Sequence, residues 1–520
     1  MVSRDKERGG NGARGRALLG VDLGAGSLKA SVVAFDGPLL GEAAEPIETR
    51  HPRFGWAEQD PRAWVAALNR AVPRALEAAG IAAGEVAAVG LSAGAHIPVL
   101  LDQDDQPLRP AILWSDTRAS AEAAELHARA GALIQERSLN KANATWTLPM
   151  LAWIQRHEPE VAAKVRKLCL AKDYLRLCLT GTWETDFSDV IGALMGDLRS
   201  GGWSEELCAL IDWPMETLPP VVAPTQVVGG VTAAAARAAG LAPGTPVVCG
   251  SNDTTVEFFG IGAVEPGMGA IKLATAGVLF SAADRPLVNP PISCYPHILP
   301  GLYYIATGTN SCASSHRWVR DTLFQPNDAA ADGAAVFAEM DRLAATAAPG
   351  SGGLLFHPYL QGERAPYWDP LLRADFVGLT MRHSRAEIAR AVYEGIAFSI
   401  RDLVEQARAV GQELAEVKVI GGGAKSATWR QIIADVTGLS LVLPGNGDAS
   451  FGAALVAAVG IGLFPDPRAA VEACVTSVAR AEPAPKRQAF YDDLFDLYRE
   501  TQQALAPINH KLHALVDPKT

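Results

Sequence analysis

Two short segments share one layout and constrain the fold more than any other feature of the chain. In the first, Leu18–Leu23 and Lys29–Phe35 have the composition of strands and flank a turn of small residues. In the second, about 250 residues later, Ala270–Ala274 and Val278–Ser281 flank a similar turn. Apolar and β-branched runs on either side of a small-residue turn are typical of β-hairpins. The repetition points to a duplicated fold.

Strands and helices alternate in both halves of the chain, which predicts α/β domains. The clearest helix is Pro61–Ala79, because Asp60 suits the N-cap position and Pro61 the first turn. Apolar spacing also predicts helices at Ser384–Arg408 and across Glu160–Leu179.

The domain boundaries follow from this alternation and from the composition of the N-terminus. The first 16 residues are charged and glycine-rich and have no apolar core of a signal peptide, so we expect a disordered leader. We place an N-terminal domain at 17–263 and a C-terminal domain at 264–505.

Composition limits the classes of partner. The chain has 520 residues, with 46 Lys and Arg against 57 Asp and Glu, and its formal net charge is −11. This balance argues against a general nucleic-acid or anionic-membrane partner. No apolar run reaches the ~18 residues of a membrane-spanning helix. The seven cysteines form no CxxC pair, which predicts reduced thiols, no zinc site and a cytoplasmic protein.

The first turn, Gly24–Ser27, has the residues of a phosphate-binding loop. Its glycines let backbone N–H groups approach an anion, and its serine adds a hydroxyl donor. The loop is neither a Rossmann fingerprint nor a Walker A motif, because Lys29 replaces the third glycine and a strand follows. Asp22 stands beside the loop, where its carboxylate can hold hydrated Mg²⁺ or tune the electrostatic field at the phosphate. A phosphate cradle and a plain tight turn both remain open.

Two segments of the second half carry similar small residues. Thr275 lies in the second turn and supplies a hydroxyl there. Gly421–Ser426 joins the predicted strand Glu416–Ile420 to a predicted helix at Ala427–Gly438, where bare backbone can approach a flat ring or a phosphate. A ligand-binding junction and a simple helix-entry turn both fit this segment.

Asp253 follows the predicted buried strand Pro246–Gly250, at the end of a strand where α/β proteins bind ligands. Small polar residues surround it in the sequence, so its carboxylate can act as a general base toward a hydroxyl. The alternative is an N-cap for the helix that follows.

Gly90–Gly94 matches the GxSxG nucleophile elbow of α/β-hydrolases, with Ser92 as the nucleophile. An elbow requires a helix after the serine, whereas Ile97–Leu101 contains Pro98 and predicts a strand. We therefore reject the hydrolase interpretation. His96, in the same segment, is either a structural histidine or a ligand to a polar substrate.

Taken together, these segments resemble the FGGY carbohydrate kinases, most closely their xylulokinase branch. The most specific match runs from Ala374 to Leu379 and, after seven residues, from Glu387 to Glu394. Further segments match the family in order and spacing: Gly362–Pro366, Leu113–Arg118, Ala171–Leu175 and Gly421–Ser426. The resemblance extends from about Ala17 to Gly462.

The resemblance implies two actin-like ATPase domains of the ribonuclease-H-like type, with ATP in a cleft between them. It implies Asp253 as the catalytic base and Asp22 as the acid linked indirectly to Mg²⁺. The implied sugar-binding residues are Ala95, His96, Trp114, Asp253 and Thr254. The implied ATP-binding residues are Gly24, Ala25, Gly26, Ser27, Thr275, Gly422, Gly423, Ala424 and Lys425.

Several positions depart from the xylulokinase pattern. Ala95 stands where a methionine is usual, Ile97 where a glycine is usual, and Thr254 where an asparagine is usual. The second phosphate turn contains alanine at 274 and 276, and Met150 replaces a lysine. The changes at Ala95 and Ile97 reshape the sugar pocket, and the kinase machinery as a whole stays recognisable.

The expected reaction is transfer of phosphate from ATP to a small sugar or polyol, most simply a ketopentose such as D-xylulose, giving its 5-phosphate. The alternatives are another ketose, a tetritol or a linear signalling sugar, and, outside the class, an actin-like ATPase switch. The resemblance also allows a homodimer, which no feature of the sequence decides.

Overall fold

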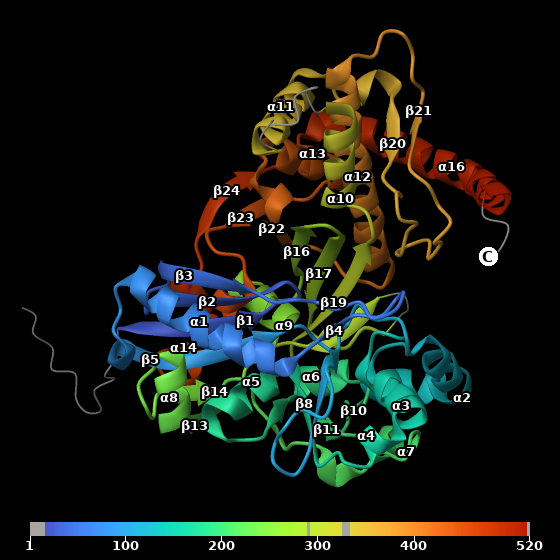
Figure 1. The fold of residues 1–520 in the computed structure, drawn as a ribbon. Coiled ribbons are helices and arrows are strands. Elements are labelled where there is room, and N and C mark those ends of the chain that lie inside the picture. The colour runs from blue at the N-terminus through green and yellow to red at the C-terminus, as the bar shows by residue number, and fades with distance from the viewer. Residues whose placement is uncertain (1–15, 289–291, 325–332, 517–520) are drawn as a thin grey trace, which may run out of the picture. The chain divides into compact units, whose positions relative to one another are not determined.

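The computed structural model describes residues 16–288, 292–324 and 333–516 (Figure 1), so the expected leader, Arg16 excepted, lies outside the described part of the chain. The chain forms two units. Unit 1 contains the described residues up to Ser138, together with Ala142–Gly260 and Asp448–Cys474. Unit 2 contains Leu139–Lys141, Ile261–Gly447 and the described residues from Val475.

Unit 1 is built on a mixed sheet in the order β13-β14-β5-β1-β2-β3, with the short β15 also paired to β5. The hairpin β1–β2 is antiparallel, and β5 runs parallel to both β1 and β14. The strands are β1 (Ala17–Leu23), β2 (Ser27–Ala34), β3 (Leu39–Pro46), β5 (Val86–Ala93), β13 (Val227–Gly230), β14 (Pro246–Val248) and β15 (Ser251–Asn252).

Unit 2 repeats this arrangement in the order β18-β19-β17-β16-β22-β23-β24. The hairpin β16–β17 is antiparallel, and β22 runs parallel to β16 and β23. The strands are β16 (Met268–Leu273), β17 (Gly277–Ala283), β18 (Ser293–Pro296), β19 (Tyr303–Thr309), β22 (Glu416–Ile420), β23 (Leu441–Pro444) and β24 (Ser477–Ala481). The predicted duplication is confirmed, because β3-β2-β1-β5-β14 and β19-β17-β16-β22-β23 have the same order and the same strand directions.

The helices pack against these sheets as their sequences predict. In α1 (Pro61–Ala79), the side chain of Asp60 accepts a hydrogen bond from the N–H of Arg62, which confirms the predicted N-cap. The fully buried Trp64 of α1 lies edge-on to Tyr174 of α5. The other helices of unit 1 are α2 (Ser120–Ser138), α3 (Thr147–His157), α4 (Pro159–Ala162), α5 (Ala171–Thr180), α6 (Phe187–Gly192), α7 (Glu205–Ala209), α8 (Ala233–Ala239), α9 (Asp253–Gly260), α14 (Ala449–Gly460) and α15 (Pro467–Cys474).

Unit 2 contains the longest described helix, α16. The predicted helix at Ser384–Arg408 is present as α12, with Ser384 as its N-cap. The helices are α10 (Ala313–Val319), α11 (Gly333–Thr346), α12 (Arg385–Ala409), α13 (Ala427–Thr437) and α16 (Pro485–Val516), and β20 (Leu355–His357) pairs with β21 (Asp375–Val377).

The helix α14 belongs to unit 1 although it follows most of unit 2 in the chain. It packs on β1 and β5 (Figure 1), where Gly20 and Gly90 allow the close approach. A Cβ atom on Gly20 would lie 1.7 Å from the carbonyl oxygen of Ser450, and one on Gly90 would lie 1.9 Å from that of Ala453. The boundary expected after residue 263 assigns α14 to the C-terminal domain. Its place in unit 1 could not be predicted from the sequence, because no change of composition marks the return of the chain to that unit at Asp448.

One predicted helix is wrong in its first half and right in its second, where α5 covers Ala171–Thr180. Helix was expected across Glu160–Leu179, but α4 ends at Ala162 and Lys167–Leu170 forms β8. This strand pairs antiparallel with β6 (Pro98–Leu101), and Leu168, Cys169 and Leu170 are buried. A four-residue apolar run fits a helix or a strand equally well, and only the distant partner decides between them.

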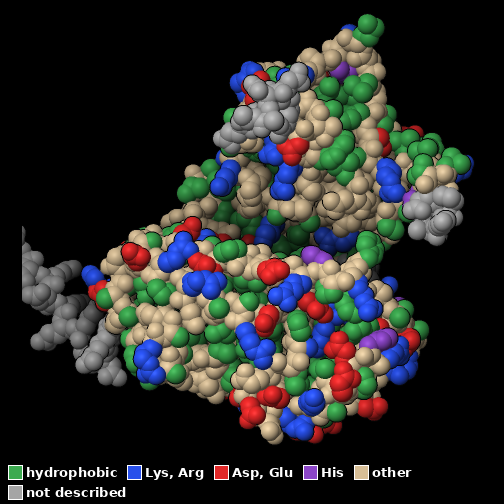
Figure 2. Space-filling view, viewed as in Figure 1, with side chains coloured by type: hydrophobic (Ala, Val, Ile, Leu, Met, Phe, Trp, Pro, Cys, Tyr) green, Lys and Arg blue, Asp and Glu red, His purple; other side chains and the backbone are tan. Residues whose placement is uncertain are grey.

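The described part of unit 1 also contains three further two-stranded pairs, and its surface carries both acidic and basic side chains. These pairs are β4 (Glu58–Gln59) with β7 (Ala111–Ile112), β9 (Thr185–Asp186) with β12 (Val221–Val222), and β10 (Gly196–Asp197) with β11 (Gly202–Trp203). Acidic and basic side chains are interspersed over the face of unit 1 that Figure 2 shows. Within the described ranges, no helix is both long and apolar enough to cross a membrane.

Candidate active site

Two aspartates of unit 1 lie at the same edge of its sheet. Asp22 near the end of β1 is in register with Ser92 near the end of β5, and the Ser92 hydroxyl donates a 2.7 Å hydrogen bond to Asp22 Oδ1. On the other side of β5, Ser251 of β15 is also in register with Ser92. Asp253 follows two residues later, so parallel strand ends bring the two predicted acids together.

Asp22 is an unusually weak acid for an aspartate. Burial and the negative charges of Asp253, Glu257 and Asp448 together raise its pKa to about 7, against the lowering effect of the Ser92 hydrogen bond. A site that resists gaining one more negative charge favours a bound cation. Carboxylate oxygens suit Mg²⁺, which usually keeps several waters. No cluster of three or more metal-ligating side chains occurs among the described residues.

Asp253 is the first residue of α9, and the helix cap is provided by its neighbour. Asn252 Oδ1 accepts hydrogen bonds from the backbone N–H and the hydroxyl of Thr255, at 3.0 and 2.9 Å. Asn252 therefore performs the N-cap role that the sequence left open for Asp253. Asp253 Oδ1 accepts from the N–H of Thr254 at 2.6 Å and from its hydroxyl at 3.2 Å.

His96 lies in the turn between β5 and β6, beside Ala95. Its backbone has a φ of 68°, and its ring stacks on Trp146 with centroids 4.0 Å apart. Burial lowers the pKa of His96 to about 3, so the imidazole is neutral at physiological pH. The hydroxyl of Thr147 donates to the His96 carbonyl at 3.0 Å. The backbone and the ring of His96 are thus both held in place.

Trp114 lies close to the same turn. Its side chain is 47% exposed, and a Cβ atom on Gly94 would touch both its ring and the side chain of Ile97. Ser92, by contrast, is fully buried and bonded to Asp22, and a strand follows it. The rejection of the nucleophile elbow is confirmed.

The glycine-rich turn of unit 1 is anchored through its backbone. The N–H of Gly24 donates to the carbonyl of Ser27 at 3.0 Å, and Gln59 Nε2 donates to the carbonyl of Ala25 at 2.7 Å. Ala25 and Gly26 are exposed at the tip. A held turn with an exposed backbone suits an anion.

Unit 2 presents the equivalent turn, with Thr275 exposed. The carbonyl of Thr275 accepts from the Ser314 hydroxyl at 2.8 Å and from the N–H of Cys312 at 3.2 Å. The loop that leads from β19 to Cys312 is held by Glu363, which accepts from Thr309 and, at 2.7 Å, from the N–H of Asn310. Burial raises the pKa of Glu363 to about 7.

The predicted adenosine segment lies beside this turn, because β22 runs parallel to β16. Gly421 has a φ of 87°, and a Cβ atom there would lie 2.6 Å from the Leu273 carbonyl oxygen. Gly422 has open space on its Cβ side, whereas Gly423 lies against Leu273 and Trp429. Ala424 is buried and Lys425 is exposed. Both predicted nucleotide segments of unit 2 therefore lie at neighbouring strand ends.

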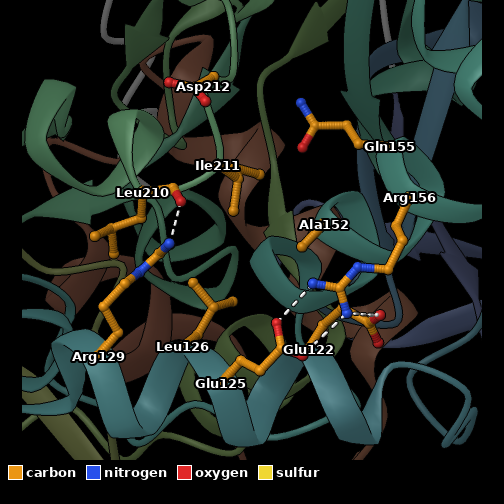
Figure 3. Close-up of a pocket in the computed structure, with 10 residues that line it drawn as sticks. All are labelled: Glu122, Glu125, Leu126, Arg129, Ala152, Gln155, Arg156, Leu210, Ile211 and Asp212. Carbon is orange, nitrogen blue, oxygen red and sulfur yellow. Dashed lines mark hydrogen bonds and ion pairs between the residues drawn. The ribbon is translucent and has the colours of Figure 1, made fainter.

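A pocket on the helical part of unit 1 contains none of these residues (Figure 3). Among its charged side chains, Arg156 pairs with Glu122 and Glu125, and Arg129 donates to the Leu210 carbonyl. It contains no predicted site residue.

The fold and these strand ends define a class. Two units of ribonuclease-H-like topology, each with a small-residue hairpin turn, have the architecture of actin-like ATPases and sugar kinases. The N-terminal domain model of the FGGY family of carbohydrate kinases matches residues 17–260, and the C-terminal domain model matches 270–461. The chain belongs to the FGGY family of carbohydrate kinases, whose members use ATP.

Individual relatives agree with this assignment over nearly the full length. A xylulose kinase of Lactococcus lactis subsp. lactis is 32% identical, covering 95% of this chain and 98% of the relative. The crystal structure of xylulose kinase from Rhodospirillum rubrum has a TM-score of 0.86 at 30% identity, covering 95% of this chain and 100% of that one. That of gluconate kinase from Lactobacillus acidophilus has a TM-score of 0.86 at 27% identity, covering 95% of this chain and 99% of that one.

Three contacts at the site escaped the sequence analysis. Ser92 was considered only as a nucleophile, although it bonds to Asp22. Trp146, which stacks on His96, and Glu363, which holds the loop before Cys312, lie far from their partners in the sequence. For Glu363 the matching family segment Gly362–Pro366 was a usable signal.

Replacing Asp22 should stabilise unit 1 at alkaline pH. Because its folded-state pKa lies above the ordinary value, the folded protein binds this proton more tightly, and stability falls as pH rises from about 4 to about 7. We expect Asp22→Asn to raise the melting temperature by several degrees at pH 8 and to lose this gain toward pH 4. Scanning calorimetry measures it, with the exposed Asp36→Asn as control. Equal melting temperatures of Asp22→Asn and the unmodified protein at pH 8 would contradict the raised pKa of Asp22.

Proposed function

We propose that the chain transfers the γ-phosphate of ATP to the terminal hydroxyl of D-xylulose, giving D-xylulose 5-phosphate. The choice of sugar is supported by the full-length similarity to xylulose kinases. His96 supports the choice of an uncharged sugar over a sugar acid. Its imidazole is neutral and therefore supplies no positive charge to pair with the carboxylate of a sugar acid.

In this proposal Asp253 accepts the proton of the attacking hydroxyl. Its place at a strand end, with the helix cap provided by Asn252, supports that role. His96 and Trp114 contact the sugar together with Thr254 and Ala95. Trp114 offers a half-exposed ring for this contact.

The nucleotide is assigned to the exposed turns and the glycine segment. Gly24–Ser27 and Thr275 face the phosphates, and Gly422, Gly423, Ala424 and Lys425 receive the adenosine. Asp22 would hold Mg²⁺ indirectly through water, and a bound ion would supply positive charge to offset that of the phosphates. Transfer then depends on positioning and electrostatic stabilisation rather than on a covalent enzyme intermediate.

D-Gluconate is the second candidate, since the gluconate kinase structure matches nearly as well. The changes at Ala95, Ile97 and Thr254 also leave room for another ketose or a tetritol.

The test is sugar-dependent ADP release with Mg·ATP across D-xylulose, D-ribulose, D-gluconate, erythritol and no sugar. We expect kcat/KM for D-xylulose to exceed that for D-gluconate by about tenfold or more, because only gluconate brings a carboxylate to the neutral His96. A reversed preference would reject D-xylulose. ADP release that no sugar changes would favour an ATPase switch.

A further inference from the structure

A buried group of charged side chains lies in unit 1 beneath the segment that leads into α9. Lys172 of α5 is 1% exposed, and its ammonium lies 2.6 Å from Asp173, 3.0 Å from Asp186 and 2.9 Å from Asp189. All three carboxyl groups are buried. Charges taken out of water are costly unless they are paired, so such a group is an expensive feature to keep without a purpose.

The group holds the segment before α9 at two points. Arg176, fully buried and paired with Asp173, donates from Nη1 to the carbonyl of Cys249 at 3.1 Å. The hydroxyl of Ser251 donates to Asp186 Oδ2 at 2.7 Å. Both contacts come from residues more than 60 positions earlier in the chain, Arg176 in α5 and Asp186 at the end of β9.

A third contact follows from the N-cap of α6. Asp186 Oδ2 also accepts from the N–H of Ser188 at 3.0 Å, which fixes the start of that helix. The Ser188 hydroxyl accepts from Asn252 Nδ2 at 3.0 Å and lies 2.9 Å from the Thr255 hydroxyl. Asn252 and Thr255 flank Asp253 and Thr254, so the support reaches both sides of the aspartate.

The segment has little regular structure of its own to fix it. Gly250 turns with a φ of 76°, and β15 contains only Ser251 and Asn252. A Cβ atom on Gly250 would lie 2.0 Å from the carbonyl oxygen of Leu91, so the backbone approaches β5 closely. Side-chain contacts from Asp186 and Arg176 therefore supply much of the definition of this turn.

We infer that Lys172 and Asp186 are positioning residues for Asp253, acting through the hydroxyl of Ser251. The inference rests on the proposed role of Asp253 as the base. Lys172 fixes the Asp186 carboxylate, Asp186 fixes Ser251, and the backbone from Ser251 carries Asp253. Displacement of a catalytic group by about 1 Å can cost about 10²-fold in rate, so looser support lowers turnover without touching the substrate.

Ser251→Ala tests this link, because it removes one hydroxyl and adds no volume. We expect kcat with D-xylulose to fall about tenfold while KM for ATP stays unchanged. Amide hydrogen exchange in residues 251–257 should quicken, which reports the order of the segment without any substrate. The matched control is Ser204→Ala, which removes another buried hydroxyl of unit 1, the N-cap of α7. It should leave kcat and this exchange unchanged.

A second comparison separates positioning from a general structural role. In the Asp253→Asn background, Ser251→Ala should lower kcat no further, since the group it positions is gone. An additional tenfold loss there would overturn the inference, as would exchange and kcat equal to those of Ser204→Ala. If Asp253→Asn alone left turnover intact, the proposed base would be rejected, whatever Ser251→Ala did. If no sugar supports turnover, the exchange measurement still tests the inference. Exchange of residues 251–257 that is the same in Ser251→Ala as in the unmodified protein would overturn it.

Discussion

Asp253→Asn should lower turnover with D-xylulose by about 10²–10⁴-fold and leave ATP binding intact. Asparagine keeps the size of the side chain and can still accept from the N–H of Thr254, but it cannot take the proton of the attacking hydroxyl. Steady-state ADP release gives kcat, and calorimetric titration with ATP gives the nucleotide affinity. The two together separate loss of chemistry from loss of binding.

The control for this variant is Asp212→Asn. Asp212 is exposed in unit 1 and has a left-handed backbone with a φ of 50°, which asparagine adopts readily. We expect its kcat to equal that of the unmodified protein. An Asp253→Asn variant that retained near-normal turnover would remove the proposed base from the reaction.

Lys172→Met should be the most destabilising of the substitutions considered. It leaves Asp173, Asp186 and Asp189 buried without the ammonium that lies within 3.0 Å of each. Removing one partner from a buried charge network costs about 3–5 kcal/mol, because the remaining charges stay out of water. Burial already raises the pKa of Asp189 to about 8, and loss of Lys172 should raise it further.

Lys167→Met is the matched control for that variant. Lys167 pairs with Asp105 at 2.8 Å, but both side chains are partly exposed, at 32% and 40%. Such a pair contributes about 1 kcal/mol or less. Urea unfolding gives the free energy of unfolding of Lys172→Met and of Lys167→Met. Hydrogen exchange of the α5 and α6 amides then compares the local stability of the two variants. Equal stabilities would mean that water or rearranged partners replace Lys172.

Local patterns in the sequence predicted the elements that position the site. The two hairpins, the capped helix at Pro61–Ala79 and the strand Glu416–Ile420 are all present, because their turns, caps and apolar runs are encoded by adjacent residues. The strand at Lys167–Leu170 was missed because only its pairing with β6 decides its conformation.

The sequence indicated the two candidate aspartates but not the side-chain contacts that hold the backbone around them. Asp22 was selected because it stands beside the glycine-rich turn and Asp253 because it follows a buried strand, and the structure brings them to one sheet edge. The contacts from Asp186 to Ser251 and from Trp146 to His96 join residues 65 and 50 positions apart, as their numbers show. No local pattern marks such pairs, because they form only when the helices between them have packed.

The most direct test is to identify the product of the unmodified protein with Mg·ATP and D-xylulose. Phosphorus and carbon NMR locate the phosphate, and a coupled assay counts the ADP. We predict one ADP for each sugar phosphate, with the phosphate on the terminal C5 hydroxyl. ADP formed together with free phosphate and unchanged sugar would contradict sugar phosphorylation and favour an ATPase.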